Sequence, residues 1–241
     1  MNNKFDNLEI AADNQQISYG FFMKRLFELH YDCNHEHYLS EVFVPFFQMC
    51  STDNTKIVPI FDDRSCGPRT DNETESKRRM KTICAKKENG EYVVPDYIYV
   101  PSEYSFANPQ KPYLMVETKN PVLIIREETH YRDLSHYVID NQTELRAEIE
   151  ACGYVVFTDG ITWMFLEERD GEIVESDTYG TIRLVNKFES YYKTNRISMK
   201  YGIVQMDLSF MNEGVYDVAE EPEEWNVLKN RITELLQNLS K

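Results

Sequence analysis

The architecture of this chain can be read outward from two stretches, VVPDYIYV (residues 93–100) and PYLMVETK (residues 112–119). Both are rich in β-branched and aromatic residues, which favour strands. Strands that follow one another along a chain are commonly neighbours in a sheet. We therefore expect these two stretches to pair.

Polar side chains stand at the ends of these two expected strands. Asp96 opens the first, and Glu117 and Lys119 close the second. Residues i and i+2 of a strand point to the same face, so the Glu117 carboxylate and the Lys119 ammonium should emerge side by side. Leu114 and Val116 have the opposite parity and should face a core.

Two carboxylates and one ammonium suit the hydrolysis of phosphodiester bonds. Mg²⁺ prefers oxygen ligands and needs only one or two carboxylates beside waters and substrate oxygens. A lysine next to them can orient or deprotonate the attacking water and offset charge in the transition state. Taken singly, Asp96 reads as a turn residue, and Glu117 with Lys119 reads as an exposed strand-end pair. The combination in this order predicts a Mg²⁺ centre.

The motif Val-Pro-Asp…Val-Glu-Thr-Lys resembles the Pro-Asp…(Asp/Glu)-x-Lys signature of the restriction-endonuclease-like, or PD-(D/E)XK, superfamily. Residues 154–165 resemble the "apolar strand, Thr-Asn-Gly, x-x-Trp" segment of the type I restriction enzyme R-subunit N-terminal nuclease module, with Asp159 in place of the asparagine. The apolar run over residues 43–47 is also similar to that module. The resemblance covers residues 30–166.

The resemblance implies an α/β fold with a restriction-endonuclease-like mixed central β-sheet flanked by α-helices. It implies Mg²⁺ as cofactor, with Mn²⁺ as a substitute, held by Asp96 and Glu117. Lys119 would position the attacking water. Gln142 matches a helical glutamine that helps to organise the site in the superfamily.

The N-terminal helix of the superfamily supplies a further metal-binding carboxylate, for which Glu36 and Glu41 compete. At about 100° per residue, Glu36 lies nearer to the apolar stripe of the expected helix over residues 35–49. Glu41 points toward solvent, so we assign the role to Glu36. His35 and His37 flank it at a spacing that spreads them over different helix faces, which argues against a zinc site.

Charge is strongly patterned along the chain. The net charge is −15, yet residues 77–87 carry six positive charges and no negative ones. Nucleic-acid affinity comes largely from phosphate neutralisation. A protein with a net negative charge can still have a positively charged surface at its binding site. The expected phosphate contacts are Lys77, Arg78, Arg79 and Lys81. The alternative for such a run is a solvated surface.

Length and composition bound the remaining organisation. A chain of 241 residues with 41% hydrophobic content supports one domain over residues 1–241, with residues 217–241 a candidate helical appendage for dimerisation. The start lacks an apolar signal region, and no apolar run approaches a membrane span. Five scattered cysteines suggest free thiols. We expect a cytoplasmic protein without membrane contact.

Hydrophobic periodicity and turn residues predict the other elements. Asn89-Gly90 and Asp159-Gly160 predict tight turns between strands. The expected helices cover residues 17–31, 35–49 with a bend or interruption at Pro45, 127–151 with an interruption near 140–141, and 222–239. The expected strands cover residues 81–85, 92–94, 154–158 and 161–166, and residues 172–185 form another strand or pair of strands. The expected loops cover residues 62–76 and 101–112.

These features predict a Mg²⁺-dependent deoxyribonuclease, an endonuclease or exonuclease in a restriction or mobile-element defence setting. No P-loop signature is present, so translocation or specificity would come from a partner chain. Double-strand cleavage would favour a homodimer. Two alternatives stay open: a nucleic-acid or protein binding module that has lost catalysis, which the charge of −15 favours, and RNA as the substrate.

Overall fold

A computed structural model describes residues 17–23, 25–26, 39–60, 82–105, 107–119, 134–184, 197–200, 203–206 and 221–241. Its centre is a seven-stranded sheet in the order β1-β4-β5-β6-β7-β8, with β9 also paired to β7. The strands are β1 (Thr55–Pro59), β4 (Tyr97–Pro101), β5 (Leu114–Thr118), β6 (Val155–Thr158), β7 (Thr162–Arg169), β8 (Glu172–Glu175) and β9 (Thr181–Arg183).

The sheet is mixed but mainly antiparallel. Strands β1, β4 and β5 form an antiparallel meander. Strand β6 then pairs parallel to β5, after two helices, α5 (Leu134–Asp140) and α6 (Gln142–Cys152). A parallel neighbour needs such a crossover connection. The remaining pairs, β6–β7, β7–β8 and β7–β9, are antiparallel.

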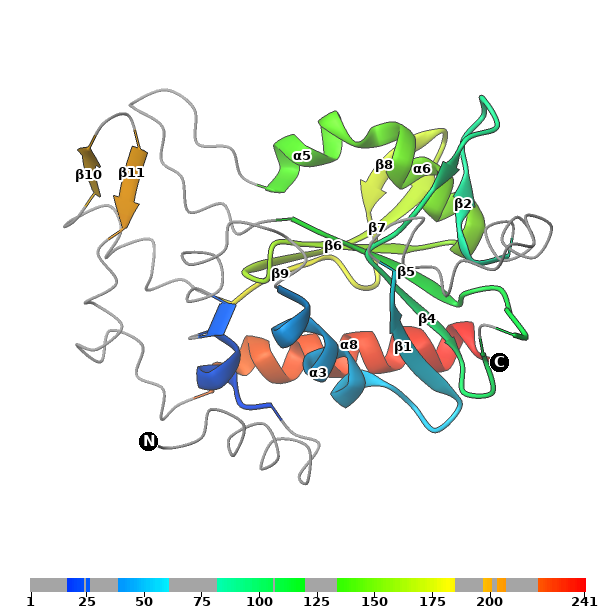
Figure 1. Ribbon diagram of the computed structural model, residues 1–241, viewed down its shortest axis with the longest axis horizontal. Helices are drawn as coiled ribbons and strands as arrows, with labels where there is room; N and C mark the ends of the chain where they lie inside the picture. Colours follow the sequence, from blue (N-terminus) through cyan, green and yellow to red (C-terminus); the bar gives the residue numbers. More distant parts are fainter. Residues whose placement is uncertain are drawn as a thin grey trace.

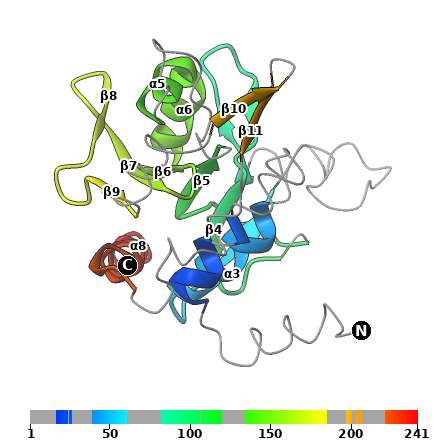
Figure 2. The ribbon, with the colours of Figure 1, turned by 90° about the vertical axis from the view of Figure 1, so that its left-hand side faces the viewer.

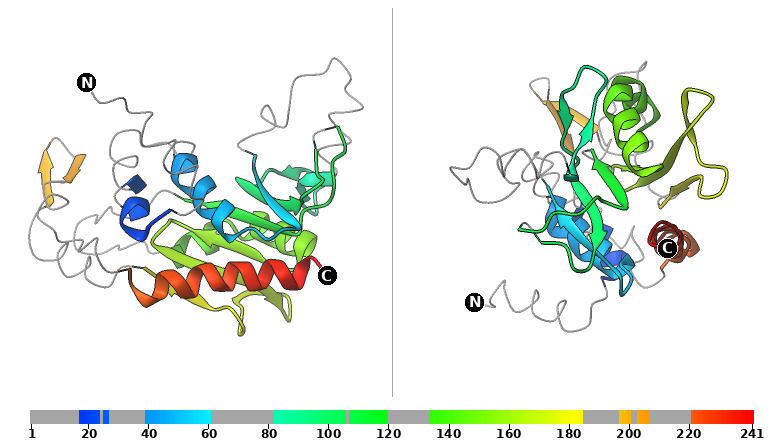
Figure 3. Two further views of the ribbon diagram at one scale, coloured as in Figure 1. Left: turned by 90° about the horizontal axis from the view of Figure 1, so that it is seen from below. Right: turned by 90° about the vertical axis from the view of Figure 1, so that its right-hand side faces the viewer.

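Helices cover both faces of the sheet (Figures 1 and 2). On one face lie α3 (Ser40–Cys50) and α8 (Glu223–Leu239), and α8 runs along that face in Figure 3. On the other face lie α5 and α6. Alternate residues of β5 divide between the two layers, as expected for a strand buried on both faces. Leu114 and Val116 pack with α3 and α8, whereas Met115 packs with α6.

The face toward α3 and α8 is held by aromatic packing. The indole of Trp225, on α8, lies 4.9 Å from the ring of Phe46, on α3, between centroids. Phe46 in turn lies 5.0 Å from Trp163, on β7. All three side chains are fully buried. Helix α8 therefore contributes to the same hydrophobic cluster as α3 and the sheet.

Several expected turns and breaks are confirmed. The hairpin at Asn89-Gly90 joins β2 (Ala85–Lys86) to β3 (Tyr92–Val93), with Gly90 at a φ of 89°. The expected interruption near residues 140–141 falls between α5 and α6. A further hairpin pairs β10 (Ile197–Lys200) with β11 (Ile203–Met206). The expected loop over residues 62–76 lies outside the described residues.

Two local expectations are wrong. Pro45 does not interrupt α3, which continues through it from Ser40 to Cys50. Proline has no N–H group, so the helix loses only the hydrogen bond from residue 45 to the Glu41 carbonyl. The strand expected over residues 81–85 is reduced to its end, because residues 82–83 take a helical turn that buries Ile83.

No helix of the described residues is long and apolar enough to cross a membrane.

Candidate active site

The polar ends of β4 and β5 lie side by side in the sheet. The two strands are antiparallel, with Tyr97 opposite Val116, and one further step in this register sets Asp96 opposite Glu117. The expectation that these carboxylates come from neighbouring strands is confirmed. Glu117 has the parity of Met115, which packs toward α6, so the two carboxylates belong to the face that α6 covers.

Thr118 holds the carboxylate of Asp96 in place. Both the backbone N–H and the Oγ1 hydroxyl of Thr118 donate to Asp96 Oδ2, each at 2.7 Å. Hydrogen bonds to an ionised carboxylate are stronger than neutral ones, and Thr118 is buried. One oxygen of Asp96 is thereby fixed at the end of β5.

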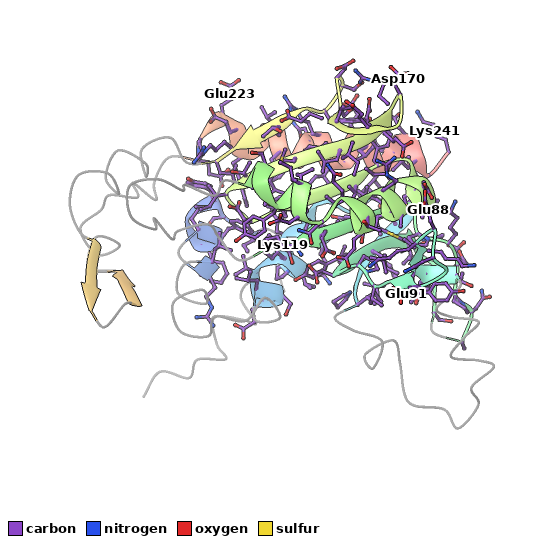
Figure 4. The ribbon with its side chains drawn as sticks, turned by 90° about the horizontal axis from the view of Figure 1, so that it is seen from above. Glu88, Glu91, Lys119, Asp170, Glu223 and Lys241 are labelled. Carbon is purple, nitrogen blue, oxygen red and sulfur yellow. The ribbon has the colours of Figure 1, made fainter. Side chains whose placement is uncertain are left out.

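Lys119 follows β5 directly and turns back onto Glu117. Its Nζ lies 2.9 Å from Glu117 Oε1, and its backbone N–H donates to the Thr158 carbonyl at 2.8 Å, extending the β5–β6 pairing by one residue. The two side chains are only 15% and 11% exposed, so water screens their attraction weakly. The side-by-side placement expected from the i, i+2 spacing is confirmed. Figure 4 shows Lys119 in the middle of this face.

The carboxyl group of Glu117 is only partly paired despite its contact with Lys119. Its second oxygen, Oε2, is buried and has no hydrogen-bond partner among the described residues. Burial, and then the charge of Asp96, outweigh the opposing effect of Lys119 and together raise the pKa of Glu117 from 4.5 to about 8. A buried carboxylate with too little positive charge nearby favours its protonated form.

A third carboxylate, which the sequence reasoning missed, belongs to Glu148 on α6. Its side chain is fully buried, and neither carboxylate oxygen has a hydrogen-bond partner among the described residues. Burial raises the pKa of Glu148, and the charge of Glu117 is the next largest cause, ahead of Asp96. Glu148 thus lies within electrostatic reach of both strand carboxylates.

A signal for Glu148 was present in the sequence. Leu145 and Ile149 are spaced i, i+4 and define the buried side of α6. Glu148 lies three residues after Leu145 and next to Ile149, so helical periodicity places it on the same side. A charged residue on the apolar stripe of a helix is unusual enough to mark a functional site.

The three carboxylates fit a divalent cation by the chemistry of their donors. Glu117 Oε2 and both oxygens of Glu148 are buried acceptors that have no donor in the part of the chain that the structure describes, and hard oxygen ligands suit Mg²⁺. No group of three or more Asp, Glu, His or Cys side chains in the described ranges already stands close enough to hold an ion. Mg²⁺ keeps several waters when it binds a protein, so two carboxylates suffice.

Gln142 is not brought to this cluster. It is the first residue of α6 and is exposed. It lines a surface cavity together with Lys86, Glu88 and Arg146. Figure 4 shows Glu88 at one end of the molecule, away from Lys119. On α6, Glu148 rather than Gln142 is buried and within electrostatic reach of Glu117.

The described residues do not include the remaining expected site residues, which are Glu36, Lys77, Arg78, Arg79 and Lys81. Glu41 is exposed and pairs with Arg25, with Glu41 Oε2 2.7 Å from the guanidinium. This agrees with the expectation that Glu41 points to solvent.

The Asp159-Gly160 turn holds β6 and β7 beside the site, as its sequence predicted. Asp159 Oδ1 accepts hydrogen bonds from the backbone N–H groups of Ile161, at 3.0 Å, and Thr162, at 2.7 Å. Gly160 has a φ of 83°, and an added Cβ there would lie 2.7 Å from Leu26 Cδ2. Only glycine therefore fits this turn without displacing Leu26.

Neither a protein-family model, nor a curated protein, nor a solved structure matches this chain.

Proposed function

We propose that this protein is a Mg²⁺-dependent deoxyribonuclease with a restriction-endonuclease-like fold. The observation that carries the proposal is the contact between Lys119 Nζ and Glu117 Oε1 at 2.9 Å, beside Asp96 on the neighbouring strand. Two carboxylates and a lysine thus converge at one end of a mixed sheet flanked by helices, an arrangement that fits the resemblance of the motif.

Asp96 and Glu117 would hold the cation. When bound, Mg²⁺ would neutralise the charge of a phosphodiester and polarise it toward attack. Two hydrogen bonds from Thr118 to Oδ2 fix the carboxylate group of Asp96, so that this group would need little reorganisation to bind the cation. Preorganised groups of this kind are the main source of electrostatic catalysis.

Lys119 would act on the attacking water and on the phosphate. Glu117 orients the ammonium through their hydrogen bond. The amino group at this place can direct a water toward phosphorus and stabilise the negative charge that develops on the phosphoryl oxygens. The small exposure of Lys119, at 15% of its side chain, strengthens that effect because few waters compete with it.

DNA is the proposed substrate, in a restriction or mobile-element defence setting. The basic residues 77–87 would track phosphates beside the site, and a second copy of the chain would allow cleavage of both strands. The net charge of −15 favours a second candidate. In that case the protein would bind a nucleic acid or another protein without cutting.

Cleavage assays separate these candidates. Purified protein would be incubated with supercoiled, linear and single-stranded DNA, and with RNA, in Mg²⁺ or Mn²⁺. Lys119→Ala is the test variant. Lys111→Ala is the matched control, because Lys111 is exposed and precedes β5, whereas Lys119 follows it.

The proposal expects wild type and Lys111→Ala to cut DNA equally, and Lys119→Ala to be slower by about 100-fold or more, as for loss of a charge-stabilising group. If wild type cuts none of the substrates above the level of Lys119→Ala, the nuclease proposal fails and the binding module is favoured. If RNA is cut and DNA is not, the substrate assignment is wrong.

A further inference from the structure

We infer that Glu148 is the third carboxylate of the proposed cation site, so that α6 supplies a share of its cation affinity. The inference rests on the proposed function, because it assigns a new residue to the same site. Its role is electrostatic and does not require direct contact with the ion, since Mg²⁺ retains several waters in proteins.

The burial of Glu148 is the first argument. Its side chain has no exposed surface, and both carboxylate oxygens lack hydrogen-bond partners among the described residues. Fully buried acidic groups are normally paired, because an unpaired buried charge is strongly unfavourable. A buried glutamate that plays only a structural part would be expected to hold a donor.

The cations near α6 are engaged elsewhere, which is the second argument. Lys87 lies 3.0 Å from Glu144 on the first turn of α6. Arg146 donates to the Gly171 carbonyl at 3.0 Å and lies 3.6 Å from Glu168. Lys119 pairs with Glu117. Lys87, Arg146 and Lys119 therefore each have an acceptor other than Glu148.

Charge balance is the third argument. A cation binds ionised carboxylates. In that state Asp96, Glu117 and Glu148 contribute three formal negative charges, and Lys119 contributes one positive charge, so the cluster carries −3 + 1 = −2. One divalent cation neutralises that sum. Without Glu148, the two strand carboxylates and Lys119 would sum to −1, and a divalent ion would leave an uncompensated positive charge in a buried site.

The test is the binding of Mn²⁺ to the full chain, measured by the loss of the free-ion electron paramagnetic resonance signal, so no activity is needed. Glu148→Gln keeps the shape of the side chain and removes its charge. Glu150→Gln is the matched control, because Glu150 is on the same helix but exposed. Glu148→Leu gives a second, apolar replacement, and urea unfolding without cation checks that each variant folds.

We expect Mn²⁺ to bind wild type and Glu150→Gln alike, and the dissociation constant to rise by about tenfold or more in both Glu148 variants, in line with losses from groups that support a metal site. If wild type binds Mn²⁺ and Glu148→Gln binds it equally well, the inference is overturned while the nuclease proposal stands. If wild type itself does not bind Mn²⁺, both are overturned.

Discussion

Asp96 and Thr118 tie the start of β4 to the end of β5. Thr118 donates to Asp96 Oδ2 from both its backbone N–H and its hydroxyl, each at 2.7 Å. The strand end that carries Glu117 is thereby locked to the carboxylate on the neighbouring strand. The small side chain of Thr118 thus sets the position of the Asp96 carboxylate.

Replacing Thr118 with valine should weaken this lock. Thr118→Val keeps the size of the buried side chain and the backbone donor but removes the hydroxyl. We expect the free energy of unfolding to fall by about 1.5–3 kcal/mol, the usual effect of losing a hydrogen bond to a charged group. Urea unfolding measures it. The matched variant Thr118→Ser keeps the hydroxyl and loses the methyl group, and it should lose less stability. A larger loss in Thr118→Ser than in Thr118→Val would mean that the methyl group contributes more than the hydroxyl.

Stability without divalent cation should fall as pH rises from about 4.5 to 8. The pKa of Glu117 is raised to about 8 in the folded protein from 4.5. In this window the unfolded chain has released the proton that the folded chain still holds, so raising the pH favours unfolding. One such group contributes a slope of about 1.4 kcal/mol per pH unit. Burial raises the pKa of Glu148 as well, which acts in the same direction.

Urea unfolding at several pH values, with a chelator present, tests this dependence. Glu117→Gln should flatten the decline and be more stable than wild type near pH 8, because it removes a poorly compensated buried charge. Glu150→Gln, an exposed control on α6, should follow wild type. Parallel curves for wild type and Glu117→Gln would show that Glu117 titrates normally.

Gly160 should tolerate no side chain, whereas Gly153 should tolerate one at moderate cost. Both have a positive φ, 83° and 85°, so alanine at either adds backbone strain of about 1–2 kcal/mol. At Gly160 the new Cβ would also lie 2.7 Å from Leu26 Cδ2, while at Gly153 nothing lies within 4 Å. Gly160→Ala should therefore lower the thermal midpoint clearly more than Gly153→Ala. Equal shifts would mean that Leu26 yields freely.

Trp225 should be essential for stability although it lies near the end of the chain. Its side chain is fully buried, and its ring lies 5.2 Å from Phe22 and 4.9 Å from Phe46. Trp225→Ala should lower the free energy of unfolding by about 3–5 kcal/mol. Gln237→Ala, at an exposed position of α8, is the control. A small loss in Trp225→Ala would indicate that α8 is an appendage after all.

Local patterns were enough to predict most of the elements around the site. A continuous apolar run over residues 113–116 identified β5. The i, i+2 spacing placed Glu117 beside Lys119, because it follows from the geometry of a single strand. The turn at Asp159-Gly160 was also predictable from the sequence, because an Asp-Gly pair between two strands favours a tight turn in which glycine takes a positive φ. The function of the site stays a prediction.

Only the tertiary structure decided which residues lie near Glu148 and against which elements α8 packs. Helical periodicity puts Glu148 on the buried side of α6, but only the packing of α6 against the sheet brings it within reach of Glu117. Likewise, the apolar stripe of α8 predicted that this helix packs against a hydrophobic surface but not which one. In the structure, Trp225 of α8 contacts Phe46 of α3. The burial and the electrostatic environment of a side chain depend on contacts with residues distant in sequence. A local sequence pattern therefore cannot predict which residues meet.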